Sequence, residues 1–152
     1  MLFLGLGNPI LSDDAVGIRV VEEIKSIVGK KDGIEFTVGD IAGVDILDVI
    51  RGYDELVIVD AVKKGGTPGS LYTISLDELN DSIHLTSIHS INFATAMEFG
   101  RKMGIKVPSR ISIYGIEVRD VVTFSEKMTR EVEKSTRKNA QEIVNMEISE
   151  LT

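Results

Sequence analysis

The amino-terminal segment joins a short apolar run to a glycine turn and then to two acids, and it constrains the fold most strongly. Residues 1–4 are apolar, and residues 5–9 (Gly-Leu-Gly-Asn-Pro) form a turn signal. Asp13 and Asp14 then open a segment with helical periodicity. A buried strand that ends in a glycine turn beside a helix start is typical of open α/β sheets, in which polar chemistry gathers at the carboxyl edge. The segment therefore predicts a site there, and its acids suit a metal ion or a proton rather than a phosphate.

Composition narrows the class of protein. The chain has 152 residues, 43% of them hydrophobic and 27% charged, which predicts a single soluble domain over residues 1–152. The net charge of -7 argues against nucleic acid as a partner, because no basic stripe is present to neutralise phosphates. No apolar run is long enough to span a membrane, and no signal-peptide pattern precedes the first strand. The absence of cysteine excludes disulfides and thiolate sites. We expect a cytoplasmic protein.

Hydrophobic periodicity predicts an alternation of strands and helices. The segment 63–69 is too short for a helical crossover, so the fourth strand should run antiparallel to the third. The order βαβαββαβα predicts an α/β fold, a three-layer αβα sandwich on a five-stranded mixed sheet with one antiparallel strand. The expected strands are 2–6, 34–38, 56–60, 70–76 and 111–116; the expected helices are 13–28, 42–50, 90–104 and 126–146; residues 77–88 are expected to be irregular.

Common catalytic and nucleotide-binding motifs are missing. The third glycine of a dinucleotide-binding turn is replaced by Ile10, and Asp13 and Asp14 would repel a pyrophosphate. The sequence has neither a G-x-S-x-G elbow nor an H-E-x-x-H helix. Its two histidines, His84 and His89, are five residues apart, which does not place them on one helix face. The pattern gives no support to a conventional serine, cysteine or zinc protease.

Three residues at strand–helix junctions are the candidate site. Asp14 lies at the start of the first helix, although Ser12, Asp13 or Asp14 could instead cap that helix. Asp60 ends the most hydrophobic strand, where an acid is costly unless it is solvated, paired or bound to a cation. Its structural alternative is an acid that accepts hydrogen bonds from the following loop. His89 precedes the helix 90–104, where a histidine is often only a hydrogen-bonding residue.

Taken together, Asp14, Asp60 and His89 form a set of two oxygen ligands and one nitrogen ligand with open positions. Such a set suits a divalent ion such as zinc or nickel. His84 lies in a polar loop, and we expect no role for it.

These features together resemble the hydrogenase maturation endopeptidases, which trim the large subunit of nickel-iron hydrogenases. The resemblance covers nearly the whole chain and implies a phosphorylase/hydrolase-like αβα sandwich. It also implies that Asp14, Asp60 and His89 bind a metal and carry the catalysis. The residues that carry the resemblance are Gly5-Leu6-Gly7-Asn8, Asp13-Asp14, Gly17, Gly39-Asp40-Ile41-Ala42-Gly43, Ile58-Val59-Asp60-Ala61 and His89.

The implied reaction removes a carboxyl-terminal extension from the hydrogenase large-subunit precursor after nickel insertion. In this view the nickel is supplied by the substrate and is engaged by Asp14, Asp60 and His89, which could also hold a divalent metal of their own. A cation between enzyme and substrate can polarise a carbonyl or activate water, which suits a site without its own nucleophile. Either Asp14 or Asp60 could act as the base, giving an aspartate- and metal-dependent protease.

One departure from the family pattern concerns substrate binding. Many members carry an acid shortly after the second strand, immediately before paired glycines. Here Val38 stands at that position, and Asp40 could substitute from two residues later. We therefore assign substrate binding to Asp40.

Two alternatives remain open from the sequence. Peptidyl-tRNA hydrolases also begin with a strand and Gly-Leu-Gly-Asn-Pro, but they continue with a tyrosine and a Thr-Arg-His-Asn run, where this chain has residues 11–14 (Leu-Ser-Asp-Asp). The acidity of the chain also disfavours tRNA. The other alternative is a non-catalytic, nickel-sensing maturation chaperone that recognises a nickel-loaded protein without cutting it.

Overall fold

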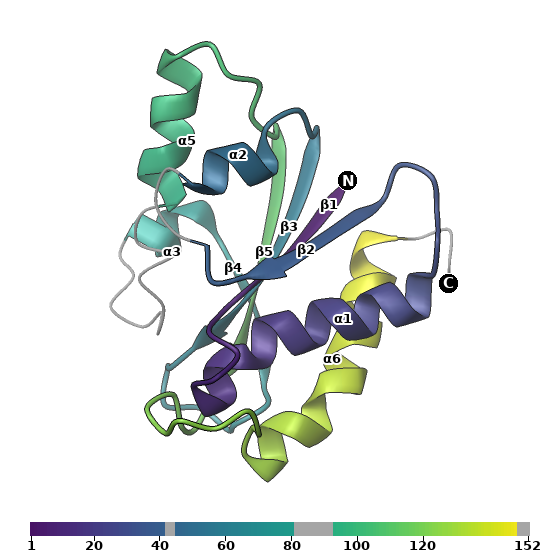
Figure 1. Cartoon of the computed structure of the whole chain (residues 1–152), viewed down its shortest axis with the longest axis vertical. Helices are drawn as coiled ribbons and strands as arrows, with labels where there is room; N and C mark the ends of the chain where they lie inside the picture. Colours follow the sequence, from purple (N-terminus) through teal and green to yellow (C-terminus); the bar gives the residue numbers. More distant parts are fainter. Residues whose placement is uncertain (42–44, 81–92, 149–152) are drawn as a thin grey trace.

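The fold is a twisted sheet with helices on both faces (Figure 1). The computed structural model describes residues 1–41, 45–80 and 93–148. Within these ranges the strands are β1 (Leu2–Leu6), β2 (Glu35–Gly39), β3 (Glu55–Val62), β4 (Leu71–Ile74) and β5 (Arg110–Glu117). The helices are the 3-10 turn η1 (Ser12–Ala15), α1 (Val16–Val28), α2 (Asp45–Ile50), α3 (Leu76–Asn80), α5 (Phe93–Lys102) and α6 (Arg130–Glu147).

The sheet has the strand order β2-β1-β3-β5-β4. Neighbouring strands from β2 to β5 are parallel, and β4 runs antiparallel to β5. The predicted five-stranded mixed sheet with one antiparallel strand is confirmed. The fourth strand does run opposite to the third, but its partner is β5, which lies between them.

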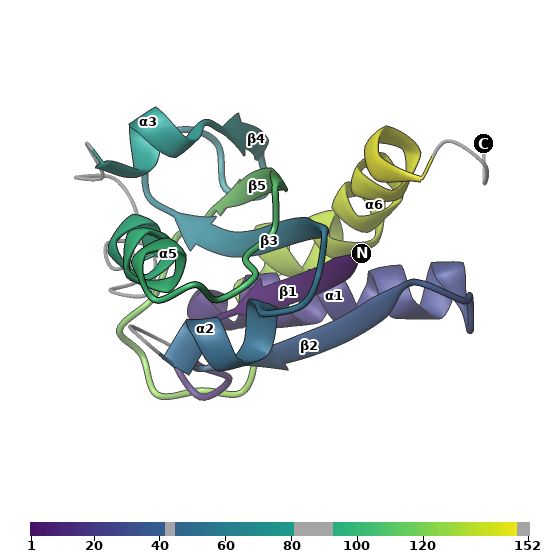
Figure 2. The ribbon, with the colours of Figure 1, turned by 90° about the horizontal axis from the view of Figure 1, so that it is seen from above.

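Alternation along β3 divides the core into two layers. Val57 and Val59 pack toward α1 and α6, whereas Leu56, Ile58 and Val62 pack toward α2 and α5. Figure 2 shows α1 and α6 on one side of the sheet and α2 and α5 on the other. Because both faces are covered, the central strand is apolar almost throughout, as the dense run 56–59 predicted.

The expectation that β3 ends at Asp60 is wrong. The strand continues to Val62 because β5 pairs with it as far as the Val62–Glu117 position. On its other side β1 stops earlier, at the Gly5–Val59 position. At Asp60, β3 therefore still pairs with β5 but no longer with β1. This places the acid at the edge of the sheet on the β1 side.

The two long helices begin later than predicted. The first starts with η1, and its α-helical part begins at Val16. The last begins at Arg130 rather than at Glu126, because Thr129 is held in extended conformation and donates hydrogen bonds to the carboxylate of Asp13. This contact joins parts of the chain that are far apart in sequence, so local periodicity gives no sign of it.

Two smaller differences concern short segments. Residues 77–80, expected to be irregular, belong to α3, which packs against α5. Residues 42–44, 81–88 and 90–92, for which the sequence makes predictions, lie outside the described residues. In the described part of the chain, the helices are all too short or too polar to cross a membrane.

Candidate active site at the carboxyl edge of the sheet

Glycines bring the first helix and its preceding turn directly onto the strand ends. A Cβ atom on Gly17 would lie 2.5 Å from the carbonyl oxygen of Leu6 and would also overlap the carbonyl oxygen of Val59. A Cβ on Gly7 would overlap the carbonyl oxygen of Asp14. Only hydrogen fits at these positions. The glycines of the amino-terminal motif therefore allow close backbone packing, and this packing places Asp14 against the end of the sheet.

Asp14 is a buried acid beside the ends of β1 and β3. The residue is only 7% exposed, and its Oδ2 accepts a hydrogen bond of 2.9 Å from the backbone N–H of Asn8. The turn η1 that carries it contacts β3. The alternative role as a helix cap is not observed: the residues that precede η1 and α1 are Leu11 and Ala15, and neither makes a side-chain capping bond.

Asp60 is the second buried acid at this edge. It is 2% exposed, and its Oδ1 accepts a hydrogen bond of 2.8 Å from the backbone N–H of Ala61. Because side chains alternate along a strand, Asp60 belongs to the same face as Ile58 and Val62, which α2 and α5 cover. Asp60 thus makes one backbone hydrogen bond of the kind expected for a structural acid, and it does so on the strand that the turn η1 contacts.

The remaining candidates are only partly described. Asp40 is exposed and directly follows β2, whose last carbonyl, on Gly39, accepts a hydrogen bond from Gly7 N–H at 3.2 Å. Asp40 therefore lies at the same edge of the sheet as the two buried acids. His89 and His84 lie outside the described residues. Among the residues that are described, no three acids or histidines are grouped so as to hold a metal ion, and the predicted ligand set needs His89 as its third member.

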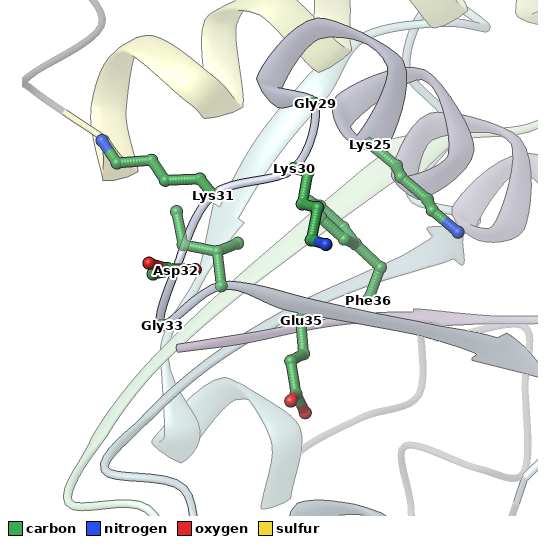
Figure 3. A pocket seen from close by; sticks show the side chains of 9 residues that line it. Lys25, Gly29, Lys30, Lys31, Asp32, Gly33, Glu35 and Phe36 are labelled. Atoms are coloured by element: carbon green, nitrogen blue, oxygen red, sulfur yellow. The ribbon is translucent and has the colours of Figure 1, made fainter.

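A large cavity of the described structure lies elsewhere. It has a volume of about 720 Å³ and is formed by the end of α1, the loop after it and the start of β2. Figure 3 shows Lys25 and Lys30 extending over Phe36 on one side of β2, while Glu35 points to the other side. This cavity is open and lies at the amino end of β2, whereas Asp14 and Asp60 lie at the carboxyl ends of their neighbours. It is not the site that the sequence predicts.

Comparisons with known proteins agree on one family. The family model described as hydrogenase maturation protease matches residues 18–146. The chain is 30% identical over 118 residues to the hydrogenase 2 maturation protease of Escherichia coli K12, covering 76% of this chain and 71% of the relative. It is 25% identical over 134 residues to the hydrogenase expression/formation protein HupD of Rhizobium leguminosarum, covering 87% and 66%.

The chain belongs to the hydrogenase maturation protease family.

A solved structure of this family confirms the fold. The hydrogenase maturating endopeptidase HybD from Escherichia coli superposes with a TM-score of 0.79 at 24% identity, covering 95% of this chain and 90% of that one. Membership makes the chain a protease, and hence a hydrolase. The matched range 18–146 contains Asp60, His89 and Asp40, whereas Asp14 precedes it.

Of the adjacent acids in this maturation protease, Asp13 is structural. It is fully buried, and its Oδ2 accepts hydrogen bonds from the backbone N–H groups of Arg119 and Asp120 at 2.9 and 3.0 Å. Its Oδ1 accepts the N–H of Thr129 at 2.7 Å. These bonds fasten the loop after β5 to the turn that carries Asp14. Sequence reasoning selected Asp14 for the site but missed the structural role of Asp13, because its donors come from more than 100 residues away.

Glu117 is a second buried acid that sequence reasoning missed. It ends β5, is 1% exposed, and accepts hydrogen bonds from the backbone N–H of Lys64 and of Gly66, the latter at 2.8 Å. It also accepts the hydroxyl of Tyr72 at 3.1 Å, and burial together with this bond raises the pKa of Tyr72. Glu117 thus holds the loop between β3 and β4 in place. Its position after an apolar run, like that of Asp60, was the available signal.

Proposed function

We propose that this protease cleaves the large-subunit precursor of a nickel-iron hydrogenase and removes its carboxyl-terminal extension after nickel has been inserted. The observation that supports the proposal is that two carboxylates, Asp14 beside the residue Asn8 that follows β1 and Asp60 near the end of β3, are both buried in a member of the maturation protease family. The curated relatives named as hydrogenase maturation or formation proteins support the same substrate class.

Two buried acids at one edge are well suited to a cation. Burying a carboxylate is costly unless it is hydrogen-bonded and paired with positive charge. Asp14 and Asp60 each accept a hydrogen bond from a neighbouring backbone N–H, which orients the carboxylate. In the proposed complex, nickel arrives as part of the substrate, and Asp14, Asp60 and His89 complete its coordination. This set of oxygen and nitrogen donors matches the preferences of nickel.

The chain's own residues then have two tasks in the cleavage. The first is to position the metal-bearing end of the precursor, which Asp14, Asp60 and His89 do by ligation. The second is to take a proton from the attacking water, for which Asp14 and Asp60 are the candidates. The nickel itself supplies Lewis-acid polarisation of a nearby carbonyl or water.

The decisive experiment compares nickel-loaded and nickel-free precursor. In the proposal the enzyme completes the coordination of the nickel, so this stabilisation exists only in a complex that contains nickel. The loaded precursor should therefore be shortened and the nickel-free precursor left intact. Intact-mass measurement of the precursor, incubated with metal-free enzyme, gives the readout. Efficient cleavage of nickel-free precursor would contradict the proposal, and binding without any cleavage would favour the nickel-sensing chaperone.

Substitutions test the three proposed ligands. Asp14→Asn, Asp60→Asn and His89→Ala should each reduce the processing rate by two orders of magnitude or more, about the loss typical of a single catalytic group. His84→Ala is the matched control and should process the precursor at the wild-type rate. Equal loss in His84→Ala would show that the wrong histidine is assigned.

We also propose that Asp40 contacts the substrate. It is exposed, and it lies at the edge where the buried acids are found. Asp40→Asn should raise KM for the precursor and leave kcat nearly unchanged. The control is Asp32→Asn, because Asp32 is also an exposed acid but precedes β2, whereas Asp40 follows it. A fall in kcat alone would argue for a catalytic rather than a binding role.

A further inference from the structure

Three large apolar side chains are exposed on two neighbouring loops. Ile10, in the loop after β1, is 48% exposed; Val122 and Phe124, in the loop between β5 and α6, are 79% and 81% exposed. We call these three residues the apolar rim. Exposure of this degree is unusual for an aromatic side chain, because an aromatic residue gains more than most from burial. Contiguous apolar surface at loop tips often marks an interaction site.

The two loops form a single hydrogen-bonded unit. Ser125 N–H donates to the carbonyl of Ile10 at 2.9 Å, and Ser12 N–H donates to the carbonyl of Ser125 at 2.9 Å. The carboxylate of Asp120 accepts the N–H groups of Val122 and Thr123, each at 3.0 Å. Hydrogen bonds therefore fix the backbone of the loop that carries the exposed side chains of Val122 and Phe124. A preorganised loop loses less conformational freedom on binding.

The apolar rim adjoins the candidate active site. The same turn that follows Ile10 carries Asp13 and Asp14, and Asp13 N–H donates to the carbonyl of Asp120 at 2.8 Å. In Figures 1 and 2 the segment between β5 and α6 passes beside the turn after β1. A protein whose cleavage site reaches Asp14 would have to lie next to these loops.

We propose that the apolar rim docks an apolar patch on the folded body of the hydrogenase large-subunit precursor. This inference rests on the proposed function. The precursor is favoured over a second copy of this chain because the rim is hydrogen-bonded to the turn that carries Asp14, where the precursor has to be held during cleavage.

The test replaces rim residues and measures binding and cleavage separately. Phe124→Ser and Val122→Ser remove apolar surface that makes little contribution to the core, so both variants should unfold at the wild-type temperature. Their matched controls are Phe99→Ser and Met103→Ser, which alter exposed residues (47% and 64%) in and just after α5. Sedimentation velocity with nickel-loaded precursor reports complex formation, and intact mass reports cleavage under saturating and limiting precursor.

The rim variants should bind the precursor at least about ten-fold more weakly and raise KM by a similar factor, with kcat unchanged. The controls should match the wild type. Wild-type affinity in both rim variants would overturn the inference while leaving the proposed function in place. Binding by wild-type protein without cleavage would refute the proposed function, and the rim would still be judged by its own variants. A change in self-association of the rim variants, with unchanged precursor binding, would assign the rim to a second copy and overturn the proposal.

Discussion

Replacing Asp13 with alanine should destabilise the fold far more than any change at its neighbour Asp14. Three backbone donors, on Arg119, Asp120 and Thr129, lose their acceptor in Asp13→Ala. An unsatisfied buried donor costs about 1–3 kcal/mol, and these donors are only partly buried, so we take the lower figure for each. The expected loss in the free energy of unfolding is therefore about 3 kcal/mol, a large share of the 5–15 kcal/mol typical of a domain.

The variant Asp14→Ala is the matched comparison. Its carboxylate accepts a hydrogen bond from the backbone of Asn8, and the loss of that bond should cost about 1 kcal/mol. Urea unfolding followed by far-ultraviolet circular dichroism gives both free energies. Thermal unfolding should show a midpoint roughly 6–12 °C below wild type for Asp13→Ala, from about 2–4 °C for each kcal/mol. Activity assays add a second contrast, because Asp14→Ala should process no precursor although it remains folded.

Two outcomes would refute this reasoning. If Asp13→Ala unfolded within about 1 kcal/mol of wild type, its hydrogen bonds would not fasten the loop after β5. If Asp14→Ala proved the less stable of the two, Asp14 would be the structural acid and the assignment of the site would have to be reversed.

Two further changes test other parts of the structure. Gly17→Ala should lower the free energy of unfolding by about 1–3 kcal/mol or more in urea unfolding, since its new methyl meets two backbone carbonyls. The control is Gly39→Ala, which should be nearly neutral because the nearest contact of its methyl would be at 3.5 Å. Equal effects would mean that α1 can move away from the sheet. Burial, and after it the hydrogen bond to Glu147, raises the pKa of Tyr114. The neutral side chain therefore stabilises the fold below the unfolded pKa of about 10, and this stabilisation is lost as the pH rises further. Tyr114→Phe should therefore weaken the fall in thermal midpoint above about pH 10, and an unchanged alkaline profile would contradict the assignment.

Local pattern was enough for most of the elements. The strand β1 has the predicted bounds, and the glycine after α1, Gly29, ends that helix with a positive φ of 68°. The apolar run 56–59 lies in the central strand of the sheet, between two parallel neighbours, as its composition predicted. These features depend on residues near one another in sequence, and periodicity and turn chemistry report such interactions directly.

The errors occur where distant segments meet. The strand β3 continues past Asp60 because β5 pairs with it, and α6 begins late because Thr129 is bound by Asp13. The helical periodicity of each segment contains no information about these partners. Strand pairing and side-chain hydrogen bonds across 55 to 116 positions are decided only when the sheet is assembled.

The sequence by itself determined that acids gather at the carboxyl edge of an α/β sheet, because an apolar strand, a glycine turn and a helix start must follow one another in that order. It did not determine the structural role of Asp13. Asp13 and Asp14 have the same charge and adjacent positions, yet Asp13 is enclosed by backbone donors from the loop after β5, whereas Asp14 accepts a hydrogen bond from Asn8, after β1. That difference exists only in the tertiary structure, since it is the surrounding donors that decide the role of a buried carboxylate.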